Sequence, residues 1–161
     1  MKTQSIMKVY AHKIGAVFYI LWGLLHIAGG VVLLQQLAAD GATKALATIG
    51  SAVPPVDLPI ISGGVTAAVL AYYAWNILCI GLLVLVVGVR LNWNNSRMGY
   101  WLNLAVVGAV DLGLIFTLLA PGYMALADGG LGLALWLPAA IFSTIGLLHH
   151  HPQRAGQDVP A

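Results

Sequence analysis

The sequence predicts an all-α integral membrane protein, a four-helix antiparallel transmembrane bundle with both termini in the cytoplasm (N-in/C-in). The first basis is composition: 60% of the 161 residues are hydrophobic and only 7% are charged. An ordinary soluble domain is about one-quarter charged. So few charges cannot cover a water-facing surface, and this excludes a soluble enzyme, a disordered tail and a coiled coil. The net charge of +2, with no basic stripe, also excludes a nucleic-acid partner.

The second basis is the length of the apolar stretches. A hydrocarbon core of about 30 Å needs about 20 helical residues. The chain meets this requirement four times within a single transmembrane domain, over residues 14–38, 64–89, 100–120 and 131–149. Pro54, Pro55 and Pro59 interrupt the first connection, and Pro121-Gly122 ends the third stretch. No stretch alternates with period two, so helices rather than strands satisfy the backbone in lipid.

The outer loop, residues 39–63, is the only long connection between the predicted spans. Its 42–49 segment is compatible with a short surface helix that covers the bundle, but a loosely packed linker is the favoured interpretation. The first apolar stretch is longer than the 7–15 residues of a signal-peptide core, so we expect it to be retained as a helix.

Basic residues predict the orientation. Six of the seven fall on one side of the predicted bundle, and only Lys44 falls on the other. The six are Lys2, Lys8, Lys13, Arg90, Arg97 and Arg154. Because cytoplasmic loops of membrane proteins carry the excess of Lys and Arg, both termini are expected in the cytoplasm, with the chain in a bacterial-type inner membrane.

Three strongly polar residues lie near the middle of the predicted spans: His26, Asn76 and Asp111. At a rise of about 1.5 Å per residue they lie at similar depths, roughly 16 to 20 Å from the cytoplasmic edge. An ionisable residue at the bilayer centre costs about 2.5–3.5 kcal/mol on insertion scales, and such residues tend to be functional. The sequence therefore predicts a polar cluster inside the bundle.

Two interpretations of this cluster remain open. In the functional one, a ring nitrogen of His26 donates to Asp111, Asn76 bridges to either, and the cluster binds a lipophilic molecule or a proton. Aromatic residues at helical spacing would surround this site, namely Trp22, Tyr72 and Tyr73. In the structural interpretation the three polar residues only fasten helices together, each hydrogen bond contributing of order 0.6 kcal/mol.

Small residues predict the helix contacts. Gly23, Gly29 and Gly30 lie near His26 at helical spacing, where glycine permits close approach of helices. A second stripe on the third predicted helix consists of Ala105, Ala109 and Gly113. This stripe could dock a second copy of the chain or another membrane protein, so a structural or assembly subunit is the alternative function.

No metal or cofactor is expected. His149, His150 and His151 are consecutive, and consecutive helical side chains point about 100° apart, so they cannot converge on one ion. A buried haem would need a second axial ligand at the depth of His26, and the sequence has no histidine or methionine there. An enzyme that uses His26 and Asp111 as acid and base is the least favoured function, because no substrate pocket follows from the sequence.

In size and four-span layout the chain is similar to the small bacterial DoxX-like membrane proteins. The similarity is one of topology, and it assigns no site residue. The expected partners are therefore the lipid bilayer, a lipophilic small molecule, and a second copy or a larger membrane complex.

Overall fold

The computed structural model describes residues 2–149, with side chains from Tyr10 onward. Four long helices dominate it: α1 (Lys2–Ala39), α3 (Val65–Arg90), α4 (Arg97–Leu114) and α5 (Leu126–Leu148). Each is long and apolar enough to cross a bilayer, α4 together with the turn that follows it. The protein is a multi-pass membrane protein with four transmembrane helices, and the predicted all-α bundle of four spans is confirmed.

The helix ends differ from the predicted ones where polar residues continue a helix. Lys2 begins α1, well before the apolar stretch at residue 14, and Leu126 begins α5 rather than residue 131. Asp128 lies in the first turn of α5, where a carboxylate interacts favourably with the helix dipole. Hydropathy alone does not detect such polar first turns. The Ser96 side chain accepts a hydrogen bond from Gly99 N and caps the start of α4.

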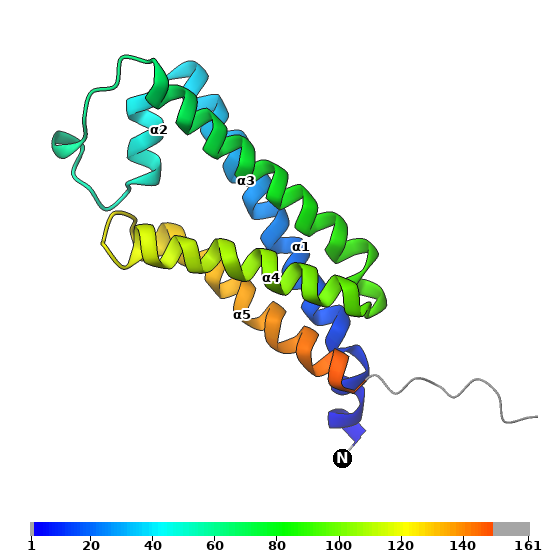
Figure 1. The fold of residues 1–161 in the computed structure, drawn as a ribbon. Helices are drawn as coiled ribbons and strands as arrows, with labels where there is room; N and C mark the ends of the chain where they lie inside the picture. Colours follow the sequence, from blue (N-terminus) through cyan, green and yellow to red (C-terminus); the bar gives the residue numbers. More distant parts are fainter. Residues whose placement is uncertain (1, 150–161) are drawn as a thin grey trace, which may run out of the picture.

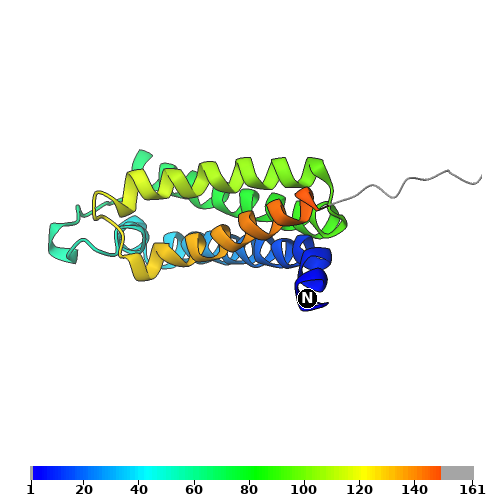
Figure 2. The same ribbon diagram turned by 90° about the horizontal axis from the view of Figure 1, so that it is seen from below.

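The bundle widens toward one end. Figure 1 shows α3 and α4 leaving the short turn η2 (Asn92–Asn94) together and then diverging. α1 packs along both α3 and α5. Figure 2 shows the same bundle from below, with the first connection and the α4–α5 loop at one end and the start of α1 and the end of α5 at the other. We call the end with the first connection the wide end and the end with η2 the narrow end.

Glycines bring α1 and α3 into close contact. A Cβ atom at Gly23 would lie 2.7 Å from the Gly81 carbonyl oxygen, and a Cβ at Gly81 would lie 2.8 Å from the Gly23 carbonyl oxygen. Gly30 is equally close to α3, with the Ala74 carbonyl oxygen 2.8 Å from its Cβ position. No larger residue fits these places, so Gly23 and Gly30 pack as the sequence predicts.

Polar side chains hold the narrow end together. The buried Asn103 side chain places its Nδ2 3.1 Å from Oδ1 of the buried Asn92. Asn95 in the turn donates to the Gly146 carbonyl oxygen at 3.1 Å, and this bond joins the α3–α4 turn to the end of α5. These bonds fix the point from which α3 and α4 diverge.

At the wide end, the first connection contains the helix α2 (Ala42–Ile49), whose Ala42 and Ala45 are buried. Thr48 Oγ1 donates to Gln36 Oε1 of α1 at 2.8 Å, and Ser51 Oγ accepts from Ala125 N at 3.1 Å. The expectation of a loosely packed linker is therefore wrong for this part of the connection. Thr48 and Ser51 anchor it to α1 and to the start of α5. The second part differs, because its Val56 and Ile60 side chains are 88% and 93% exposed.

A short π-helical segment follows α4 directly. The α-helical pattern of α4 ends at Leu114 and continues as a π-helical segment, η3 (Ile115–Leu119). The Thr117 hydroxyl, in this segment, donates to the Gly113 carbonyl oxygen at 2.7 Å. π-helical turns inside α-helices are frequent at functional sites, and η3 lies beside one of the cavities described below.

Candidate functional site

A buried tryptophan and a buried aspartate join α1 to α4. Trp22 and Asp111 are both 0% exposed. The indole Nε1 of Trp22 donates to both carboxyl oxygens of Asp111, at 3.3 Å and 3.2 Å. A buried carboxyl group without a donor is strongly unfavourable in an apolar interior. The indole N–H therefore satisfies the most polar group in the middle of the bundle.

His26 lies one helical turn after Trp22, and its ring stacks on the indole. The two ring centroids are 3.6 Å apart, and the planes are inclined by 18°. His26 Nδ1 lies 2.9 Å from the Trp22 carbonyl oxygen. A carbonyl oxygen only accepts hydrogen bonds, so Nδ1 must carry the proton. In the uncharged ring the other nitrogen, Nε2, is then an acceptor.

The three side chains meet at Gly132 of α5. The Cβ position of Gly132 lies 3.5 Å from His26 Cε1, 3.6 Å from Asp111 Oδ1 and 3.7 Å from Trp22 Nε1. His26 and Asp111 are thus neighbours, but the donor to Asp111 is Trp22 rather than His26. The direct His26–Asp111 hydrogen bond expected from the sequence is not formed among the described side chains. Trp22 connects the two by one hydrogen bond and one stacking contact.

Two cavities flank His26. The first has a volume of about 250 Å³ and lies at the wide end, between α1, α2, α3, α5 and the end of α4. The second has a volume of about 320 Å³ and lies between α1, α3 and the α4–η3 segment. Four residues line both cavities: His26, Tyr73, Ile77 and Leu114. The cavities are therefore adjacent spaces that share a wall.

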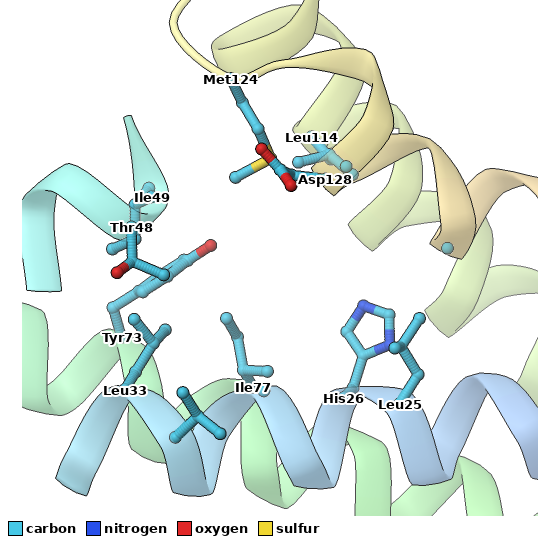
Figure 3. A pocket seen from close by; sticks show the side chains of 14 residues that line it. Leu25, His26, Leu33, Thr48, Ile49, Tyr73, Ile77, Leu114, Met124 and Asp128 are labelled. Atoms are coloured by element: carbon cyan, nitrogen blue, oxygen red, sulfur yellow. The ribbon is translucent and has the colours of Figure 1, made fainter. Parts of the chain in front are cut away.

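The His26 ring faces the first cavity. Figure 3 shows the outer ring nitrogen directed into the open space, with Tyr73 and Asp128 reaching toward the same space. Thr48 and Asp128 are exposed, so the far end of this cavity reaches the surface of the bundle. His26 lies at its inner end.

The second cavity is more apolar and opens sideways. Its wall includes Ile80, Val110 and Leu118. Ala109, Gly113 and Thr117 on the α4 side are exposed, so this cavity opens on the side of the bundle between α3 and α4.

The structure separates the other residues of the predicted site. Asn76 lines the second cavity, but its Nδ2 donates to the Tyr72 carbonyl oxygen at 2.7 Å and it does not bridge His26 and Asp111. Tyr73 lines both cavities, whereas Tyr72 is 69% exposed and lines neither. Of two adjacent tyrosines, only one faces the site.

Only some of the predicted packing residues lie in helix contacts. Gly23 and Gly30 contact α3 closely, but a Cβ at Gly29 or at Gly113 would meet no atom within 4 Å. Gly29 lines the first cavity and Gly113 the second. The remaining members of the α4 stripe, Ala105 and Ala109, are exposed, and Ala109 lines the second cavity.

Sequence reasoning missed part of the cavity wall. Asp128, Met124 and Thr48 line the first cavity, and Thr117 lines the second. Asp128 precedes residue 131, where the sequence predicts the fourth span to begin, but an acidic residue is common in the first turn of a helix, and this preference could have indicated the earlier start. Of the C-terminal histidines only His149 is described, and its Nδ1 lies 2.9 Å from the Ile145 carbonyl oxygen. His150 and His151, like Arg154, lie outside the described residues.

Comparison with known protein families, with curated proteins and with solved structures gives no match for this chain. The functional interpretation therefore starts from the residues around His26.

Proposed function

We propose that this membrane protein binds a lipophilic small molecule in the two cavities that flank His26. The observation that supports the proposal best is the position of the histidine ring, at the wall shared by both cavities. Binding sites for small molecules are mostly apolar cavities of about 300–1,000 Å³ with a few well-placed polar groups. The two cavities, of about 250 and 320 Å³, together fall within this range.

The polar groups have separate roles in this proposal. His26 contacts the ligand, while Trp22 and Asp111 are buried and position the ring from behind. A site that only fastened helices together would direct the His26 ring into a helix contact. Here one face of the ring lies on Trp22 and the outer nitrogen is directed into a cavity.

The proposal places the protein in a bacterial-type inner membrane with both termini in the cytoplasm. Lys13 Nζ lies 5.7 Å from the centre of the Trp93 ring, so Lys13 and the α3–α4 turn share the narrow end. Arg90 and Arg97 flank that turn. Lys44 lies in α2, at the wide end. The positive-inside rule then assigns the narrow end to the cytoplasm.

Filling the cavities tests the proposal. Leucine at Gly29 fills part of the first cavity and leucine at Gly113 part of the second, and neither added side chain starts in a clash. We expect the gently solubilised wild type to carry a lipophilic adduct in native mass spectrometry. The Gly29→Leu/Gly113→Leu variant should lower its occupancy about tenfold, which corresponds to about 1.4 kcal/mol.

Ala28→Leu is the matched control, because Ala28 is exposed, adjoins Gly29 and lines neither cavity. It should keep the adduct. A wild type that never carries an adduct, or an adduct that survives equally in the filled variant, would contradict the proposal. The same spectra report stoichiometry, and a dimer or larger complex that Ala109→Leu dissociates would instead favour the assembly role.

A further inference from the structure

We infer that the ligand is a neutral lipophilic molecule whose polar group donates a hydrogen bond, of which a long-chain alcohol is the simplest example. This inference rests on the proposed function and adds the chemical class of the ligand. It follows from a pattern shared by three polar side chains that line the second cavity, His26, Asn76 and Thr117. Each donates a hydrogen bond to the backbone carbonyl oxygen four residues earlier in the chain.

His26 presents the clearest acceptor. Its Nδ1 hydrogen is directed to the Trp22 carbonyl oxygen at 2.9 Å. Turning the ring over about the Cβ–Cγ bond would keep its stacking on the Trp22 indole but lose this hydrogen bond, so the hydrogen bond sets which nitrogen faces outward. In the uncharged ring Nε2 has a lone pair and no hydrogen. No other described residue hydrogen-bonds to Nε2, and Figure 3 shows the outer nitrogen directed into the first cavity.

Thr117 and Asn76 follow the same pattern on the other walls. The Thr117 hydroxyl has one hydrogen, and this hydrogen is directed to the Gly113 carbonyl oxygen at 2.7 Å. Asn76 Nδ2 donates to the Tyr72 carbonyl oxygen at 2.7 Å. Thr117 can then accept a hydrogen bond from a ligand through its hydroxyl oxygen, and Asn76 can accept one through its amide oxygen. The Asn76 amide also keeps a second hydrogen that it can donate.

The remaining polar residue of this wall does not reverse the pattern. The Tyr73 hydroxyl can both donate and accept, so it favours neither a donor ligand nor an acceptor ligand. The rest of the second cavity is apolar, including Ile77, Ile80 and Val110. A ligand that brings only an acceptor would leave Nε2 of His26 facing another acceptor. A ligand that brings a hydroxyl satisfies Nε2 from the first cavity, with its chain lying along the apolar side chains that line both cavities, Ile77 and Leu114.

A pair of probes tests the inference: dodecan-1-ol and its methyl ether, which has the same chain and oxygen but no donor. Their affinities for the full-length protein in detergent are measured by native mass spectrometry. We expect the alcohol to bind about twofold to tenfold more tightly, the range for one net hydrogen bond. In His26→Phe, which keeps an aromatic ring beside Trp22, this ratio should fall toward one.

Thr117→Val is the second variant, since it removes a hydroxyl at an exposed position without changing the side-chain shape, and we expect it to fold like the wild type. It should lower the ratio by a smaller factor than His26→Phe. The inference would be overturned if the two probes bind the wild type equally, if the ether binds more tightly, or if neither variant changes the ratio. In each case the proposed binding of a lipophilic molecule would still stand. If neither probe binds, the proposed function itself fails.

Discussion

Replacing Trp22 with phenylalanine is expected to lower the free energy of unfolding by about 1–3 kcal/mol, the cost of leaving a buried polar group without its partner. The Trp22 indole is the hydrogen-bond donor to both oxygens of Asp111, and both side chains are fully buried. Phenylalanine keeps an aromatic ring but has no N–H. The measurement is unfolding of purified protein in mild detergent, followed by circular dichroism.

A double-mutant cycle separates this bond from the loss of ring volume. Asp111→Leu alone leaves the indole N–H without an acceptor, whereas Trp22→Phe/Asp111→Leu removes both partners. The double variant should therefore be more stable than the sum of the two single losses predicts, with a coupling of about 0.5–3 kcal/mol. Asp111→Asn keeps an acceptor oxygen and should cost less than Trp22→Phe. Strictly additive losses would mean that the indole and the carboxyl do not interact.

Gly23→Leu is expected to separate α1 from α3 and to destabilise the bundle by about 1–3 kcal/mol or more, as overpacking does in a close-packed interior. Even a Cβ atom at this position would lie 2.7 Å from the Gly81 carbonyl oxygen and 2.9 Å from Leu85 N. These are backbone atoms, which cannot give way without moving a helix.

Gly29→Leu is the matched comparison on the same helix, since a Cβ there meets no atom within 4 Å. It should unfold at nearly the wild-type temperature. Both variants are compared with the wild type by thermal unfolding in the same detergent. Equal melting temperatures for Gly23→Leu and Gly29→Leu would show that the close contact between α1 and α3 does not stabilise the fold.

The spans could be predicted from the sequence because their signal is local. An apolar stretch of sufficient length, ended by proline, glycine or asparagine, indicates a span whatever it packs against. The depth of His26 and Asp111 followed from the same counting. What each side chain touches is different, because it depends on how far each helix is rotated about its axis and where it crosses its neighbours.

Adjacent residues illustrate the limit. Gly29 and Gly30 have the same local sequence signal, yet Gly30 contacts α3 and Gly29 lines a cavity. Tyr72 and Tyr73 divide in the same way. Neighbouring positions on a helix point about 100° apart, since a turn takes 3.6 residues. The sequence predicts the polar face of a helix only to within one or two residues. It therefore cannot decide which residue of an adjacent pair faces the site.

The donor to Asp111 shows the same limit in the site itself. Trp22 and His26 are four residues apart and share one face of α1, so either ring could have met α4. Which of the two rings contacts Asp111 depends on where α4 crosses α1. The sequence pattern of neither helix contains this information. The second cavity lies between α3 and the α4–η3 segment, so it depends on how these helices are placed relative to each other. The sequence thus indicated the polar groups of the site but not the space beside them.

Photochemical labelling tests the central claim most directly, that a lipophilic molecule binds beside His26. Protein in lipid nanodiscs is irradiated with a diazirine-bearing dodecanol, and the labelled peptides are mapped by mass spectrometry. The account predicts labels near His26 in α1, from Tyr73 to Ile80 in α3, and from Val110 to Leu118 in α4 and η3, all reduced by excess dodecan-1-ol. Labels spread evenly over outward-facing residues such as Leu82, Leu137 and Ile141, and unaffected by competitor, would contradict it.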